Sequence, residues 1–209
     1  MEENLASFSS IGPLYDGRVK PDVVAPGFNI LSAASTATPQ KCPTAGGAAA
    51  AGEKRVTQMA GTSMATPVVA GNAALVRQYF TEGWYPVGAK RTQHSFNPLG
   101  SLVKAVLINS GRYLTGKIGT AGAQLATNAP SQEQGFGLVG IARALHMKDA
   151  ASTESDGARD LFVVGDFEKQ KKLAVGETHE YTLEVTSSFA KSGAAPLTTL
   201  TVNGKAYTR

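Results

Sequence analysis

A serine in the segment Gly61-Thr62-Ser63-Met64-Ala65-Thr66-Pro67 has the surroundings that a nucleophile requires. A hydroxyl is a weak nucleophile at neutral pH, so it needs an adjacent base and donors for the oxyanion that forms on attack. The residues from Met64 onward predict a helix that begins here, with Pro67 in its first turn. A serine at a helix N-terminus has its own N–H and the positive end of the helix dipole where negative charge would develop. The segment therefore indicates nucleophilic catalysis by Ser63, with Gly61 leaving room for a substrate backbone.

The same residues also suit an ordinary helix start. Thr62 and Ser63 are residue types that commonly cap helices, and many helices begin after a glycine. On Gly61, Thr62 and Ser63 alone, a purely structural role is the more frequent outcome, because so short a motif matches often by chance.

Short extended segments precede this serine. Leu5 to Ser9 alternates apolar and small polar residues, and Asp22 to Gly27 holds a β-branched run that ends in Pro-Gly, so both predict strands. Asn29 to Ala33 and Arg55 to Ala60 are further strand candidates. The stretch between them, Ser35 to Lys54, has no period and predicts a surface loop.

Helical patterns follow the serine. The run from Met64 to Phe80 is apolar or small on nearly all sides, which predicts a buried helix. Leu99 to Ser110 has a helical period, and Gly111 is a candidate C-terminal cap. Gly135-Phe136-Gly137 then introduces a predicted short helix from Val139 to Met147.

The last part of the chain has a different pattern. Lys148 to Asp160 is polar and predicts a linker, and beyond it the apolar period becomes two residues. Leu161–Val164, Glu180–Val185 and Leu197–Val202 are predicted strands, with a turn at Asn203-Gly204. A β-sandwich needs about seven strands, so we expect only the beginning of an all-β domain here.

Composition excludes several classes of protein. The net charge of +4 is spread along the 209 residues, so it does not resemble the basic patch of a nucleic-acid-binding protein. No apolar run approaches the ~20 residues of a membrane span. The one cysteine, Cys42, cannot form an internal disulfide. Met1 to Asn4 does not look like a signal peptide.

The full motif G-T-S-M-A-T-P-V-V-A-G resembles the nucleophile motif of the subtilisin-like serine proteases, the subtilases. Three other segments resemble the same family in the same order. They are Ala6 to Pro13, Asp16 to Gly27 (D-G-R-V-K-P-D-V-V-A-P-G), and Gly135-Phe136-Gly137 with the residues after it. The resemblance covers Leu5 to Met147, and residues 77–109 are similar to subtilases that carry a C-terminal β-sandwich.

This resemblance implies an α/β fold, the C-terminal portion of a three-layer domain with a parallel sheet, followed by a partial all-β domain. It implies that Ser63 is the nucleophile of a serine endopeptidase, that its N–H is one oxyanion donor and that Thr62 and Gly61 adjoin that oxyanion hole. Met64 would be the residue behind the serine that is often sensitive to oxidation. The substrates would be polypeptides, and the location extracellular or in the secretory pathway. No cofactor is expected; calcium is common in the family, but no acidic cluster has the spacing of a defined site.

The rest of the triad does not match. Subtilisin places its triad in the order Asp, His, Ser, but all three histidines of this chain follow Ser63: His94, His146 and His179. Asp16 and Asp22 precede Ser63 but lie in a motif other than that of the catalytic aspartate. Asn4 and Asn29 likewise do not match the family's oxyanion asparagine.

We therefore expect the chain to be the C-terminal part of a longer subtilase. The expected boundaries are 1–148 for the peptidase part, 149–160 for a linker and 161–209 for the start of a truncated β-sandwich. The N-terminal half of the catalytic domain would be the partner of this chain, which alone would be inactive. A pseudoprotease or binding protein with the same fold is the main alternative. An α/β-hydrolase esterase ranks low because Ala65 replaces the last glycine of G-x-S-x-G.

Overall fold

The computed structural model describes residues 3–34, 56–126, 128, 130–147, 161, 163, 175–176, 199–202 and 205–208. The chain divides into two compact units. The first unit comprises Met1–Gln78 and Pro98–Ile141, and the second comprises Tyr79–Asn97 and Ala142–Arg209. The predicted domain boundaries at 148 and 160 fall on residues outside the described ones, so they stay a prediction.

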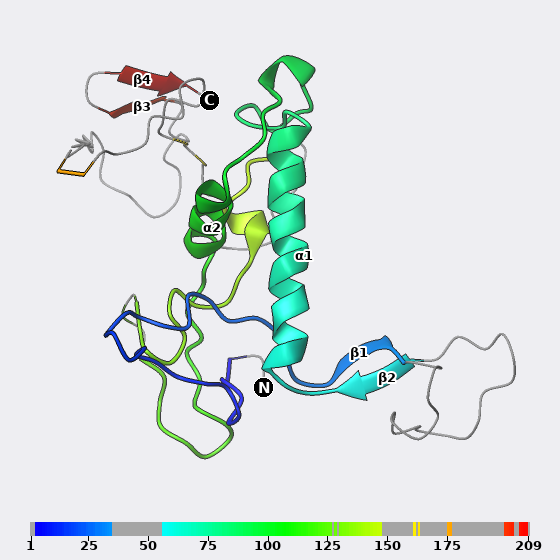
Figure 1. Cartoon of the computed structure of the whole chain (residues 1–209), viewed down its shortest axis with the longest axis vertical. Coiled ribbons are helices and arrows are strands. Elements are labelled where there is room, and N and C mark those ends of the chain that lie inside the picture. Colours follow the sequence, from blue (N-terminus) through cyan, green and yellow to red (C-terminus); the bar gives the residue numbers. More distant parts are fainter. Residues whose placement is uncertain are drawn as a thin grey trace, which may run out of the picture. The chain divides into compact units, whose positions relative to one another are not determined.

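The first unit contains a hairpin and two helices. Strands β1 (Ile30–Ala33) and β2 (Val56–Met59) pair antiparallel, with Ile30 opposite Met59 and Ala33 opposite Val56. The hairpin leads directly into α1 (Thr62–Thr81), whose last turn belongs to the second unit, and α2 (Gly100–Asn109) follows (Figure 1). The predictions of both strands and both helices are confirmed.

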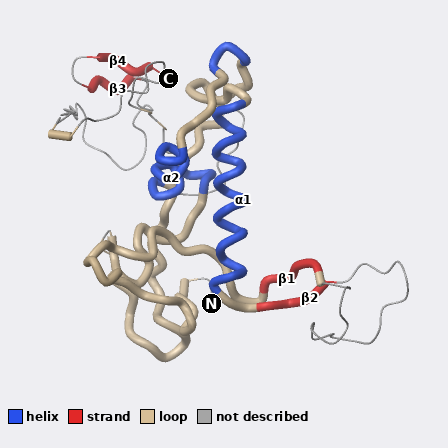
Figure 2. The backbone as a smooth tube through the Cα atoms, in the orientation of Figure 1, coloured by secondary structure: helices blue, strands red, loops and turns tan. Residues whose placement is uncertain are grey.

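Two predicted strands are reduced to single bridges. Leu5 forms one parallel bridge with Ile118, and Val24 forms one with Leu138. Most of the described backbone outside the two long helices is loop (Figure 2). The expected α/β class is therefore present as helices with a small antiparallel hairpin, and a wider parallel sheet is not formed among the described residues.

The prediction of a helix from Val139 to Met147 is wrong. Only a 3₁₀ turn, η2 (Ile141–Arg143), forms there. The residues just before this turn form backbone hydrogen bonds with other segments. Leu138 and Arg112 each donate an N–H to the carbonyl of the other, and the Val139 N–H donates to the Val24 carbonyl at 3.0 Å. A nine-residue helix is marginal by itself, so these tertiary hydrogen bonds determine the local path.

The core of the first unit gathers around three buried leucines, Leu5, Leu114 and Leu125. Val24, Ile118 and Leu138 pack against them. In the second unit the core forms around Phe80, which is fully buried. Its ring centroid lies 5.3 Å from that of Tyr79 and 5.0 Å from that of Phe96. A 3₁₀ turn, η1 (Thr92–His94), also belongs to this unit.

Helix α1 is not buried on all sides, contrary to the expectation from sequence. Val76 is fully buried, but the opposite face is exposed. We call this exposed face the α1 stripe, and it comprises Pro67, Ala70, Gly71, Ala74 and Leu75. Leu75 alone leaves 53% of its surface exposed. A stripe of small apolar residues without a charge is unusual on a solvent-facing helix side.

The C-terminal region is described only in part. Strands β3 (Thr199–Val202) and β4 (Lys205–Thr208) pair antiparallel, with Val202 opposite Lys205. This pairing confirms a strand before the predicted turn at residues 203–204. The segment Glu180–Val185 lies outside the described residues, as does most of Leu161–Val164, so the β-sandwich stays a prediction.

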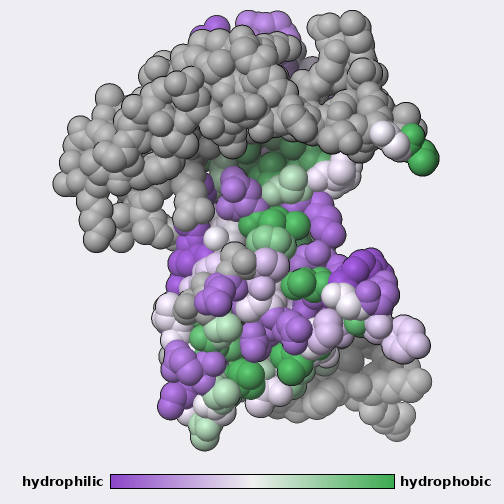
Figure 3. All heavy atoms as spheres, turned by 90° about the vertical axis from the view of Figure 1, so that its left-hand side faces the viewer, coloured by the Kyte–Doolittle hydropathy of each residue, from purple (hydrophilic) through white to green (hydrophobic). Residues whose placement is uncertain are grey.

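No helix among the described residues is both long and apolar enough to cross a membrane. On the face drawn in Figure 3, hydrophobic and hydrophilic residues are interspersed.

Candidate active site at the start of helix α1

Gly61 joins strand β2 to helix α1 through a tight turn. Its φ of 153° lies outside the range that other residues adopt easily. Its N–H donates to the Gly27 carbonyl at 2.8 Å, and its own carbonyl accepts from the Met64 N–H at 3.0 Å. The turn is therefore held from both sides, and the helix begins at Thr62 in a fixed position.

Ser63 is the second residue of α1 and is exposed. The first N–H groups of a helix have no intrahelical acceptor, and the Ser63 N–H makes no other hydrogen bond within the described part of the chain. A free N–H, the positive end of a 20-residue helix and an accessible hydroxyl thus meet at one point. This arrangement can stabilise an oxyanion next to a nucleophile.

Pro67 was expected in the first turn of α1. Because α1 begins at Thr62, Pro67 lies in the second turn instead. Because proline has no N–H, it cannot donate to the carbonyl of Ser63 four residues earlier. The Thr66 hydroxyl donates to the Thr62 carbonyl at 3.0 Å in the same turn. Proline therefore removes one bond of the helix ladder directly behind the candidate nucleophile.

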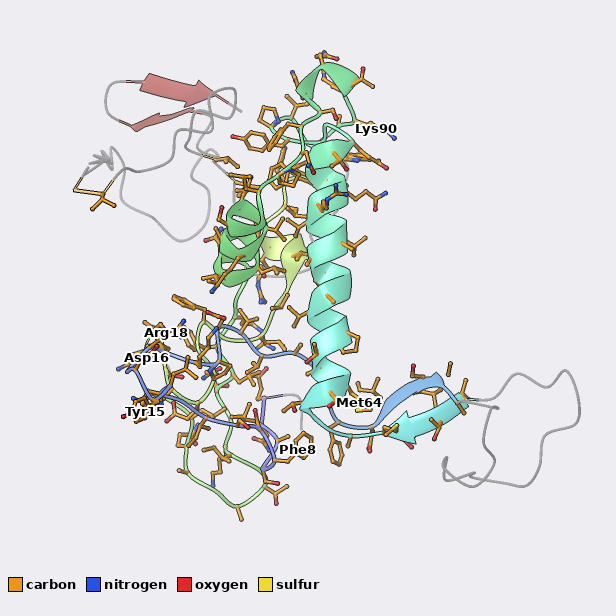
Figure 4. All side chains as sticks on the ribbon, in the orientation of Figure 1. Phe8, Tyr15, Asp16, Arg18, Met64 and Lys90 are labelled. Atoms are coloured by element: carbon orange, nitrogen blue, oxygen red, sulfur yellow. The ribbon has the colours of Figure 1, made fainter. Side chains whose placement is uncertain are left out.

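Met64 points back toward the turn. A Cβ built on Gly61 would lie 3.7 Å from the Met64 sulfur, so the thioether covers the glycine. Figure 4 places Met64 where the hairpin meets α1. In the segment that leads to the hairpin, the Phe28 ring stacks on that of Phe8, with centroids 6.4 Å apart.

The structure brings no histidine into the first unit. The histidines at positions 94 and 146 belong to the second unit, and the third, at position 179, lies outside the described residues. The His146 carbonyl accepts from the Tyr79 hydroxyl at 2.9 Å. His94 lies in η1, where its Nδ1 is buried without a hydrogen bond. Both described histidines therefore belong to the unit that does not contain Ser63.

The aspartates before Ser63 are engaged elsewhere. Asp16 pairs with Arg18 at 2.8 Å in an exposed turn. Asp22 contacts Lys20 and, at 3.1 Å, Lys104 of α2. Partial burial raises the pKa of Asp22, but the two ammonium groups outweigh burial and hold the pKa below its usual range. Asp22 is therefore an ionised structural carboxylate.

The two asparagines before the serine also have structural contacts. The Asn4 side-chain oxygen accepts from the Lys117 N–H at 2.9 Å. Asn29 has a positive φ of 56° at the start of the hairpin. Neither observation gives an oxyanion donor, in agreement with the absence of the family's asparagine motif.

A pocket of about 270 Å³ lies between α1, α2 and the segment around Val23. Its walls are mainly aliphatic, from Val69, Val103 and Leu107, and include the Asp22–Lys104 pair. Its lining includes no serine, threonine, cysteine or histidine. No group of three His, Cys, Asp or Glu side chains that could hold a metal occurs in the parts of the chain that the structure describes.

Two residues that fix the backbone of the first unit were missed by the sequence reasoning. Gly27 forms the bond to Gly61, and the only signal for it is the Pro-Gly pair that ends the A-P-G segment. Gln134 is fully buried and binds the backbone of Leu114 and Ala126. Its position within a polar stretch gave no sign of burial.

The turn and helix described above place an exposed serine in the first turn of a long helix that follows a hairpin. Comparison with family models agrees, since the model described as "Subtilase family" matches residues 1–137. The chain belongs to the subtilase family.

Curated relatives are similar over large or smaller parts of the chain. Serine protease/ABC transporter B family protein tagD of Dictyostelium discoideum is 33% identical over 93% of the chain. PI-type proteinase of Lactococcus lactis subsp. cremoris is 27% identical over 90%. Serine protease AprX of Bacillus subtilis is 44% identical over 37% of the chain.

These matches cover only 12%, 9% and 17% of the three relatives, so the chain spans a small part of their length. No solved structure matches the chain.

Proposed function

We propose that this protein is a subtilisin-like serine endopeptidase that hydrolyses peptide bonds through an acyl-enzyme on Ser63. The observation that carries the proposal is an exposed serine with a free N–H in the first turn of α1, inside the motif G-T-S-M-A-T-P of a subtilase chain. Family membership supports a protease, and the names of the relatives include serine proteases and proteinases.

In this proposal, the Ser63 hydroxyl attacks the carbonyl carbon of the scissile peptide bond while a base takes its proton. The N–H of Ser63 and the N-terminal end of α1 stabilise the resulting oxyanion. The same base then protonates the leaving amine, and water hydrolyses the ester on Ser63. Gly61 leaves space beside the serine for the substrate backbone, and Thr62 and Met64 complete the immediate surroundings.

The base, the aspartate that orients it and the second oxyanion donor would come from sequence outside these 209 residues. Two observations support this. The first unit contains no histidine, and the α1 stripe presents uncharged small residues on the same helix as Ser63. The partner would be the N-terminal half of the catalytic domain, packed against this stripe.

We also propose polypeptide substrates and a location outside the cell or in the secretory pathway, by analogy with subtilases in general. A C-terminal β-sandwich that begins near residue 161 is part of the proposal, supported by the pairing of β3 with β4. We propose no cofactor: calcium is common in the family, but no calcium site is identified among the described residues.

A pseudoprotease is the second candidate, and the absence of any histidine before Ser63 favours it. The intact glycine, serine and proline of the motif favour a protease, because a site without selection tends to lose its nucleophile.

Hydrolysis of a peptide p-nitroanilide tests both candidates. The 209-residue chain alone is expected to show no turnover above background, and a fluorophosphonate should label it poorly. A longer polypeptide that includes the Asp and His segments is expected to be active and to lose roughly 10⁶-fold in kcat on Ser63→Ala.

Ser10→Ala, which changes another exposed serine of the first unit, is the matched control and should retain activity. An inactive longer polypeptide would favour the pseudoprotease. Turnover by the short chain that disappears in Ser63→Ala would show that a base lies within these residues.

A further inference from the structure

Gly27 contacts the turn that precedes Ser63 more closely than any side chain would allow. A Cβ at this position would lie 2.7 Å from the Gly61 carbonyl oxygen and 3.2 Å from the Ala65 Cβ. The Gly27 carbonyl also accepts the Gly61 N–H at 2.8 Å. One residue thus touches the turn on one side of Ser63 and the first helical turn on the other.

Space, and not backbone conformation, requires glycine here. The φ of Gly27 lies outside the left-handed region, unlike that of Gly61. An alanine could therefore adopt the backbone angles of Gly27, but its methyl group would collide with a carbonyl oxygen that has little freedom to move.

The segment that ends at Gly27 is itself anchored. The Val24 N–H donates to the Gly137 carbonyl at 3.0 Å, and the Phe136 N–H donates to the Asp22 carbonyl at 2.9 Å. A Cβ on Gly135 would lie 2.0 Å from the Pro21 carbonyl oxygen, so this contact is also as close as two backbones can come. Lys104 of α2 adds the ion pair to Asp22. Because its own segment is anchored, Gly27 holds the Gly61 turn in a fixed position through these contacts.

We propose that Gly27 is a positioning residue for Ser63: its carbonyl and its missing side chain set the position of the Gly61 turn and hence the orientation of the Ser63 hydroxyl and N–H at the start of α1. This inference rests on the proposed role of Ser63, but its test requires no catalysis.

A thiol placed at position 63 can report this orientation. Ser63→Cys is made together with Cys42→Ser, so that only one thiol remains. Alkylation by iodoacetamide is followed by mass spectrometry as a function of pH. A helix N-terminus lowers a cysteine pKa from about 8.5 to roughly 7 or below. The pH profile of alkylation therefore reports the pKa of the thiol at position 63, which depends on how the thiol is oriented relative to the N-terminal end of α1.

Adding Gly27→Ala is expected to move the alkylation profile to higher pH by roughly one unit and to slow alkylation at pH 7 by about fivefold, because the thiol leaves the helix axis. Amide hydrogen exchange of Gly61 should accelerate in the same variant, since its acceptor is displaced. Both readouts are independent of whether the protein is a protease.

Two other glycines supply matched controls. Gly71→Ala adds a methyl group on α1, where nothing lies within 4 Å, and should leave both readouts unchanged. Gly122→Ala creates a backbone clash at 2.2 Å with the Ile118 carbonyl oxygen, in the loop after α2 and away from the contacts that anchor Gly27. Gly122→Ala should lower stability without moving the alkylation profile.

Where Gly27→Ala does not fold, Ala65→Val enlarges the other side of the same contact and should shift the profile in the same direction by a smaller amount. An unchanged profile in both variants, or an equal shift in Gly122→Ala, would overturn the proposal.

Discussion

At the scale of single residues, Gln134 shows how much a buried amide can organise. Its Oε1 accepts from the Leu114 N–H at 2.8 Å, and its Nε2 donates to the carbonyls of Leu114 and Ala126 at 3.1 and 2.8 Å. Leu114 is buried, so its N–H and carbonyl would lack these hydrogen bonds without the Gln134 side chain. The Gln134 side chain therefore joins the backbone at Leu114 to the backbone at Ala126.

Gln134→Glu is expected to lower the free energy of unfolding by about 3 kcal/mol at pH 7, because a carboxylate would face two carbonyl oxygens. Burial would raise the pKa of the new carboxyl group, so the loss should shrink as the pH falls and the group becomes protonated. Urea unfolding at pH 7 and pH 5 measures this. Gln58→Glu, on the exposed strand β2, is the control and should change stability by less than about 0.5 kcal/mol. Equal effects of the two variants would show that Gln134 has no special role.

At the scale of residues, the sequence predicts a role where a local motif determines it. It does not predict a role that depends on contacts with residues far away in the sequence. Ser63 was identified because its neighbours form a specific pattern. Gln134 lies in Ser131-Gln132-Glu133-Gln134, which has the composition of a surface loop. Only the path of the residues around Leu114 makes it buried. Gly27 was interpreted only as the end of a predicted strand for the same reason, since the segment it contacts is more than 30 residues away in sequence.

At the scale of elements, the two helices and the hairpin were predictable because their signals are local. A helical period extends through α1 and α2, and the strands β1 and β2 have extended character. Gly111 was expected to cap α2, and it directly follows the last residues of that helix, where its N–H donates to the Ile108 carbonyl at 3.0 Å. Its φ is not positive, so close approach of the Phe136 carbonyl is what requires glycine. The single bridges at Leu5 and Val24 depend on partners more than 100 residues away, which no local pattern encodes.

One such long-range connection ties the N-terminal segment to the loop after α2, and it should be sensitive to acid. Glu3 pairs with Arg112 at 2.6 Å and accepts from the Thr115 N–H at 3.1 Å. The hydrogen bond from Arg112, followed by that from Thr115, holds the pKa of Glu3 below its usual range. This contribution is present above the usual glutamate pKa of about 4.3 and is lost as the pH falls through the lower folded value.

Because both partners are largely solvated, Glu3→Gln should cost only about 0.5 kcal/mol at pH 7 and nothing near pH 2. Urea unfolding at the two pH values gives the difference. Glu133→Gln, which removes a carboxylate without an ion pair among the described residues, should show no such pH-dependent loss. A loss from Glu3→Gln that is the same at both pH values would contradict the assignment to the ionised carboxylate.

At the scale of the whole molecule, the exposed apolar surface is the feature that sequence reasoning did not locate. A helix of small apolar residues predicts burial, but which sides are covered depends on every segment that packs against it. In the described chain only one face of α1 is covered, and the α1 stripe faces outward on the same helix as Ser63. This exposure is the physical ground for expecting a partner there.

The last prediction follows from the stripe. Apolar surface that a partner would cover favours self-association when the partner is missing, so the 209-residue chain should bind a hydrophobic dye and form oligomers. Leu75→Glu is expected to reduce both effects, while the 53% exposure of Leu75 should limit the change in stability to about 0.5 kcal/mol. Light scattering coupled to size-exclusion chromatography and dye fluorescence measure this. Tyr15→Glu adds the same charge and removes a fully exposed ring from a separate turn, so it should have little effect. Equal reductions from the two variants would mean that added charge, and not the α1 stripe, controls association.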